Sequence, residues 1–166
     1  MLNTPFSIVI LFSDIAIGLA DWHLLQESTA LAVYMYGRVD WLGDHLVECS
    51  NTNGQKVTID WENGPSPVQL TLQMMGACSL ADIVEGLKQR DFDKVWIEME
   101  SERADSAPRV FTSIHMVYHI RGDVPRKLVE RIVAKSHEKY CTVSNMLKHT
   151  AEITSSVEIH TNSSRV

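Results

Sequence analysis

The residues of this chain best suited to covalent chemistry are two cysteines, Cys78 and Cys141. A thiolate is a nucleophile, and two thiols that meet can form and release a disulfide. Cys78 lies in MMGACSLADIV and Cys141 in HEKYCTVSNML, 141 − 78 = 63 positions further along. The sequence has no CxxC motif, and the cysteines have no histidines at the spacing of a metal finger, so a structural zinc site is not expected. The third cysteine, Cys49, is interpreted as a packed side chain of a strand.

Two interpretations of Cys78 and Cys141 stay open at this point. Free cysteines are among the most buried residues and usually pack as small hydrophobes. Alternatively, the helices that carry the two thiols meet in one core and bring them together. Met74 and Met75, next to Cys78, are typical either of a core or of a pocket for an apolar ligand. Attack by Cys78 would require a cation from elsewhere, since this cysteine lies about three turns into its helix, beyond the main reach of the helix dipole.

A helix over residues 68–87 is expected to carry Cys78. Gly64 and Pro65 mark a turn, Ser66 can cap the helix, and Pro67 suits its first position. The residues that follow are apolar nearly all round, which predicts a buried central helix. Small residues flank Cys78 on its N-terminal side and allow another part of the protein to approach closely.

The other elements predict an α+β fold. Alternation and turn signals indicate strands over residues 35–43, 44–50, 55–61, 93–103, 109–122 and 152–160, with Asn53-Gly54 as a hairpin turn. Asp123 is expected to cap a helix over residues 124–140, and a shorter helix follows Cys141 over residues 142–148. The strands and helices are segregated rather than alternating, which is typical of antiparallel sheets in the α+β class.

Two histidines on the fifth predicted strand were considered as metal ligands. His115 and His119 share one face of that strand, but they are roughly 13 Å apart, too far for one ion. They are interpreted as exposed polar residues. The spacing thus predicts no metal site at these residues, and no motif in the sequence indicates a bound cofactor.

Net charge, cysteine count and hydropathy indicate which partners and which compartment to expect. The chain has 166 residues and a net charge of −6, which argues against nucleic acid or an anionic membrane as the main partner. Three cysteines in a chain of this length favour a reducing compartment, and a cytoplasmic location is expected. Residues 8–20 are apolar but too short to span a bilayer and lack the basic flank of a signal peptide. We therefore divide the chain into an N-terminal extension, residues 1–34, and one domain, residues 35–166, with Met35 as a possible natural start.

Two blocks of the sequence carry a family resemblance. GPSPVQLTLQMMGACSLADIVEGLKQR, and then ESERADSAPRVFTSIHMVYHIRGDVPRKLVERIVAKSHEKYCTVSNMLKHTAEI, resemble the OsmC/Ohr family of bacterial thiol peroxidases, most closely its short OsmC-like branch. The similarity runs from about Met35 to about Ile159. It implies an OsmC-like fold and an intertwined homodimer whose two sites each draw on both subunits. It also implies that Cys78 attacks an organic hydroperoxide, that Cys141 resolves the sulfenic acid as a disulfide, and that a dithiol reductant, such as a lipoylated protein, resets the pair.

The sequence departs from the family at one position of the implied site. Peroxidase members pair an arginine with a glutamate to hold the reactive thiolate, and the position of that glutamate is Val68 here. Arg38 is the candidate for the arginine, with Arg109 as a weaker rival. Gln69, Met74 and Met75 are the candidate pocket residues.

The sequence therefore favours two functions. The first is a dithiol-dependent peroxidase that reduces organic hydroperoxides. The alternative is a dimeric OsmC-like binding module for small apolar or electrophilic molecules, with little turnover, which the loss of the acid at Val68 favours.

Overall fold

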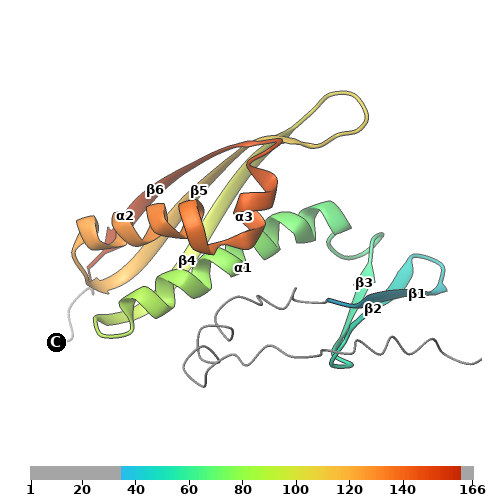
Figure 1. Ribbon diagram of the computed structural model, residues 1–166, viewed down its shortest axis with the longest axis horizontal. Coiled ribbons are helices and arrows are strands. Elements are labelled where there is room, and N and C mark those ends of the chain that lie inside the picture. Colours follow the sequence, from blue (N-terminus) through green and yellow to red (C-terminus); the bar gives the residue numbers. More distant parts are fainter. Residues whose placement is uncertain (1–34, 162–166) are drawn as a thin grey trace, which may run out of the picture.

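The computed structural model describes residues 35–161, which form two three-stranded sheets and three α-helices (Figure 1). The expectations for residues 1–34 lie outside the described residues. No helix within residues 35–161 has the length and apolar character needed to cross a membrane.

The first sheet is an antiparallel meander of β1 (Gly37–Gly43), β2 (Leu46–Asn51) and β3 (Lys56–Asp60). The predicted hairpin turn between β2 and β3 is confirmed, and Gly54 adopts the positive φ of 74° that favours glycine there. The register places most apolar residues of the three strands on one face and most polar residues on the other, with Leu46 on the polar face. The apolar face consists of Val39, Trp41, Val47, Cys49, Val57 and Ile59.

The long helix α1 (Pro67–Leu87) begins where the sequence predicts. Ser66 and Gln69 form a capping box: the Ser66 hydroxyl accepts from the Gln69 amide at 3.3 Å, and the Gln69 side chain accepts from the Ser66 amide at 2.8 Å. Gly76 provides the expected close approach, because a Cβ there would meet the Met99 side chain at 2.8 Å.

The prediction of a central helix buried all round is wrong for the single chain. One face of α1 is buried, including Met75, Ile83 and Leu87, but Met74 on another face is 53% exposed. The physical reason is that the second sheet and the C-terminal helices cover only one side of α1. Apolar side chains on its other side are left without a cover from the described residues.

The second sheet has the order β4–β5–β6, with β4 (Asp91–Arg103), β5 (Phe111–Asp123) and β6 (Glu152–His160). Its β4 and β5 are antiparallel, but β5 and β6 are parallel, so the expectation of purely antiparallel sheets is wrong. The helices between β5 and β6 carry the chain back to the starting end of β5, which makes a parallel pairing possible. All helices lie on one face of this sheet (Figure 1).

The predicted helix over residues 124–140 is two elements in the structure. Helix α2 runs from Arg126 to Lys135, and a π-helical turn follows from Ser136 to Tyr140. Pro125, not Asp123, is the N-cap residue of α2, because Asp123 is still paired with Asp91 at the end of β5. Helix α3 (Thr142–Leu147) then begins directly after Cys141, as predicted.

Candidate dithiol site

Cys78 and Cys141 lie next to each other between α1 and the start of α3. The Cys141 thiol donates to the carbonyl oxygen of Met75 at 3.8 Å, which is one turn of α1 before Cys78. Cys141 is fully buried and Cys78 is half-buried. The structure thus brings together two thiols that are far apart in the sequence, and only one of them is partly open to solvent.

The thiol of Cys141 also explains why a cysteine stands at a helix junction. Cys141 is the N-cap residue of α3, and its sulfur accepts from the backbone amide of Ser144 at 3.4 Å. The π-helical turn ends there as well, with the Cys141 amide donating to the Ser136 carbonyl at 2.8 Å. Sulfur is a weak acceptor, so the cap is weaker than a serine or aspartate cap would be. The position therefore favours a role for the thiol beyond capping.

Burial controls the electrostatics of Cys141. Desolvation, above all, raises the pKa of the Cys141 thiol, and the neighbouring Cys78 raises this pKa further. Hydrogen bonds from Ser144 act in the opposite direction. Cys141 is therefore a neutral thiol near pH 7, whereas Cys78 is the thiol that a small molecule from solvent can approach.

A buried polar network lies beside the two thiols. The Ser79 hydroxyl is 2.6 Å from the Tyr118 hydroxyl and 3.0 Å from that of Ser136, and Ser136 donates to the Asp82 carboxylate at 2.7 Å. Tyr118 also contacts Nε2 of His137 at 2.9 Å. The network joins α1, β5 and the π-helical turn, so it holds the segment before Cys141 against the helix that carries Cys78.

The network contains two groups whose protonation is governed by burial. Burial raises the pKa of Tyr118 far above its usual value, and burial lowers the pKa of His137. Both groups are therefore neutral near pH 7. Sequence reasoning missed this network, and the only signal for it was the polar residues inside helices that were expected to be apolar, such as Ser79 and Ser136.

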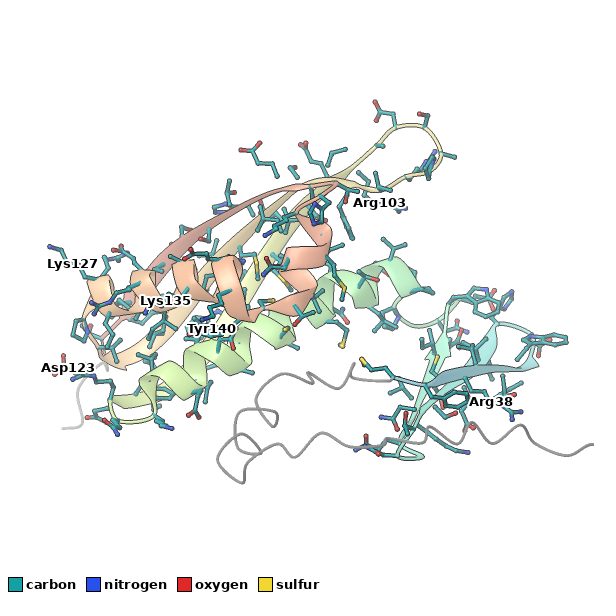
Figure 2. The ribbon with its side chains drawn as sticks, viewed as in Figure 1. Arg38, Arg103, Asp123, Lys127, Lys135 and Tyr140 are labelled. Carbon is teal, nitrogen blue, oxygen red and sulfur yellow. The ribbon has the colours of Figure 1, made fainter. Side chains whose placement is uncertain are left out.

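Arg38 is not near the thiols within the single chain. It lies on β1, on the polar face of the first sheet. Figure 2 shows Arg38 on that sheet and Tyr140, the residue before Cys141, beside the helices in the other part of the chain. The guanidinium of Arg38 makes a bidentate ion pair with Asp40, with the shortest contact at 2.7 Å. Arg109, the weaker candidate, offers its backbone carbonyl to Arg103 at 2.7 Å. The assignment of a thiolate-stabilising arginine stays a prediction.

The three predicted pocket residues do not point to one place. Gln69 is held in the capping box and lines a cavity of about 350 Å³ at the start of α1, together with Val68 and Phe111. Met75 is in the core beneath Cys141, and Met74 is exposed. Their role as the lining of one ligand pocket stays a prediction.

The fold defines a small α+β protein, and two neighbouring free thiols between two of its helices form a candidate dithiol site. The chain belongs to the OsmC-like family, since the family model described as OsmC-like protein matches residues 60–156. The resemblance read from the sequence is thereby confirmed.

Individual relatives agree with this assignment. The chain is 35% identical to Protein YhfA of Escherichia coli (strain K12) over 131 residues, which are 75% of this chain and 98% of YhfA. A hypothetical protein from Aquifex aeolicus VF5 has a similar crystal structure, with a TM-score of 0.66, 25% identity, and coverage of 76% of this chain and 98% of that one. An organic hydroperoxide resistance protein OsmC from Legionella pneumophila shares the fold, with a TM-score of 0.57, 21% identity, and coverage of 76% and 98%.

Proposed function

We propose that this protein is a cytoplasmic, dithiol-dependent peroxidase for organic hydroperoxides, in which Cys78 attacks and Cys141 resolves. The observation that carries the proposal is the pairing of a half-buried thiol with a fully buried one in an OsmC-like chain. Exposure supports this division of roles, because the attacking sulfur must meet a substrate from solvent while the resolving sulfur needs only to reach its neighbour. The hydroperoxide resistance protein of Legionella pneumophila supports the choice of substrate class.

The reaction balances with two thiols and one external reductant. The Cys78 thiolate attacks the outer oxygen of the hydroperoxide, the O–O bond breaks, and the leaving alkoxide takes a proton to give an alcohol and Cys78 sulfenic acid. The Cys141 sulfur then attacks the Cys78 sulfur, a disulfide forms, and water leaves. A dithiol, such as a lipoylated protein, reduces the disulfide through a mixed disulfide and leaves as its own disulfide. No metal or organic cofactor takes part.

The proposal includes an intertwined homodimer. The apolar face of the first sheet is open to solvent, with Trp41 72% exposed, and α1 has an uncovered apolar side with Met74 and Val84. Exposed apolar patches of this kind mark protein–protein contacts. A second copy of the chain would cover both surfaces.

Peroxide consumption tests the enzyme directly. Purified wild-type protein is mixed with cumene hydroperoxide and a lipoyl dithiol, and peroxide loss is followed with time. We expect turnover in the wild type and in Cys49→Ala, a control that removes the third thiol and keeps a small apolar side chain on the first sheet. We expect loss of turnover in Cys78→Ser, and in Cys141→Ser accumulation of a sulfenic acid that dimedone traps on Cys78. Equal rates for wild type and Cys78→Ser would refute the proposal.

A binding module with little turnover is the second candidate. Val68 favours it, because a partly buried apolar side chain stands where the peroxidases place a carboxylate. A groove of about 290 Å³ between α1 and α2 offers an apolar ligand a place beside Tyr140, the residue before Cys141. Its lining residues are Gly86, Ile132 and Tyr140 together with the charged Asp82, Glu85 and Lys135. Mass spectrometry after mild peroxide separates the two functions. Loss of two hydrogens across the Cys78 and Cys141 peptides supports the enzyme, and unmodified thiols support the module.

A further inference from the structure

The outer face of the second sheet carries a compact group of metal-ligating side chains. Side chains alternate along β5, and Tyr118 points toward the helices, where it contacts Ser79. Its neighbour His119 therefore points to the opposite face. The parallel register sets His119 beside Glu158 of β6 and places His160 two residues further along the same strand.

The three side chains converge on one point. Nδ1 of His119 is 3.0 Å from Nε2 of His160 and 3.3 Å from a carboxylate oxygen of Glu158, and that oxygen is 4.0 Å from Nε2 of His160. Ligands about 2.0–2.1 Å from a tetrahedral zinc ion are separated from one another by about 3.3 Å. Two of the observed separations are within about 0.3 Å of this value, and the His160–Glu158 separation must shorten by about 0.7 Å for the triangle to hold an ion.

The central histidine is buried, and its other nitrogen lies near a carboxylate without bonding to it. The His119 side chain is 8% exposed, and its Nε2 is buried without a hydrogen bond to any described residue. The nearest acceptor is the Glu98 carboxylate at 3.6 Å. A small shift of the Glu98 side chain would let Nε2–H donate to this carboxylate and leave the lone pair of Nδ1 directed at the cluster, the arrangement common behind metal-bound histidines.

An aromatic side chain keeps the two histidines in place. The Trp96 ring stacks on His119 at 4.7 Å and on His160 at 5.0 Å between ring centroids. Its indole nitrogen also donates to Glu98 at 3.3 Å. Trp96 thus positions both imidazoles and the Glu98 carboxylate.

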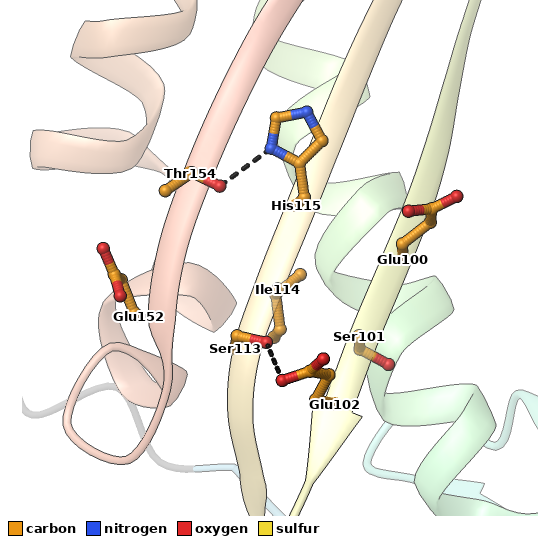
Figure 3. A pocket seen from close by; sticks show the side chains of 8 residues that line it. All are labelled: Glu100, Ser101, Glu102, Ser113, Ile114, His115, Glu152 and Thr154. Atoms are coloured by element: carbon orange, nitrogen blue, oxygen red, sulfur yellow. Dashed lines mark hydrogen bonds between the residues drawn. The ribbon is translucent and has the colours of Figure 1, made fainter.

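The outer face of the sheet carries more acidic than basic side chains, although the Lys94 ammonium lies over the Trp96 ring at 4.9 Å. The same face continues into a polar cavity of about 430 Å³ beside His115, where three carboxylates lie around the strands (Figure 3). A surface with an excess of one charge raises the local concentration of counter-ions. These carboxylates are Glu100, Glu102 and Glu152.

We propose that His119, Glu158 and His160 bind one divalent late first-row transition-metal ion, with Zn²⁺ as the ion to test first. Two imidazoles and one carboxylate suit zinc and its neighbours in the periodic table, and three protein ligands leave a position for water or a small ligand. The site lies on the face of the sheet away from the helices that carry Cys78 and Cys141, so it is distinct from the dithiol site.

Metal titration of the full-length, metal-free protein tests the proposal. Isothermal titration with Zn²⁺ is expected to show one equivalent bound per chain. His160→Ala, which removes a half-exposed ligand, should weaken that binding by more than about 100-fold, and Glu98→Gln should weaken it by about 10–100-fold. His115→Ala, on the same strand and face, is the matched control and should bind like wild type.

Thiols also bind zinc, so the experiment includes a readout for the ligand type. Co²⁺ bound at this site should give visible absorption without the intense near-ultraviolet band of thiolate coordination, and Cys78→Ser should leave the spectrum unchanged. The proposal fails if the wild type binds no stoichiometric Zn²⁺, or if His160→Ala binds like wild type. It also fails if the Co²⁺ spectrum shows thiolate bands that Cys78→Ser abolishes. Circular dichroism of each variant verifies that the fold is retained.

Discussion

The chemistry of Cys141 is set by the place where its side chain lies. A buried thiol keeps its proton more strongly than an exposed one, and the Ser144 hydrogen bonds only partly offset this effect. Because thiolate is the attacking form, the disulfide-forming step should depend on a pKa above the usual thiol value.

The first prediction is a pH dependence of this resolving step. Burial raises the pKa of Cys141, so the fraction of attacking thiolate, and with it the rate of disulfide formation from Cys78 sulfenic acid, should rise tenfold per pH unit from pH 6 to beyond pH 8. Quenched single-turnover mass spectrometry measures this rate. A rate that levels off near pH 7 would contradict the raised pKa. Ser144→Ala should slow the step at each pH, since it removes a group that lowers the pKa.

The second prediction concerns His137. Burial lowers its pKa in the folded protein below the ordinary value of 6.5. The unfolded chain therefore binds a proton more readily, so the stabilising contribution is complete above about pH 6.5 and is lost as the pH falls through 6.5 toward the folded pKa. Urea unfolding at pH 7.5 and pH 5 should show this loss in wild type. His137→Gln should flatten the dependence, whereas the exposed His149→Gln should retain it.

Among the elements, the contact between α1 and the π-helical turn matters most for the site. Turns of this type occur often at functional sites, and here the turn places Cys141 against α1. The hydroxyl of Ser79 holds the two segments together through Tyr118 and Ser136.

The third prediction follows from that contact. Ser79→Ala removes two buried hydrogen bonds and leaves their partners less satisfied, so the free energy of unfolding should fall by about 1–3 kcal/mol. Urea unfolding with an unchanged m-value measures the change. Formation of the Cys78–Cys141 disulfide should also slow. Ser155→Ala, at an exposed position of β6, is the control and should change neither quantity; equal stability of Ser79→Ala and Ser155→Ala would show that the network is not stabilising.

At the scale of the whole molecule, the first sheet has an apolar face that the described residues leave uncovered. It packs against little else in the described part of the chain. Three strands with one uncovered apolar face favour association with another surface.

The fourth prediction is that the protein is a dimer in solution through this face. Trp41→Lys places a charge at the centre of the contact and should shift the protein toward monomer by at least tenfold in the dissociation constant. Thr58→Lys, on the polar face of the same sheet, should leave the dimer intact. Analytical ultracentrifugation measures both. A wild type that is monomeric at tens of micromolar would contradict the prediction.

The sequence alone determined the features that depend on local patterns. Ser66 and Pro67 define the start of α1, alternation defines the strands, and the junction at Cys141 separates two helices, because capping and side-chain periodicity act over a few residues.

Only the tertiary structure decided which distant residues meet. It pairs β6 parallel to β5, which converts His119 from an expected exposed residue into a buried member of a histidine–carboxylate cluster. It also joins Ser79, Tyr118 and His137, which lie on three elements. Register and crossover direction depend on long-range packing that no local pattern encodes, and this is why neither the polar network nor the metal-ligating cluster could be predicted from the sequence.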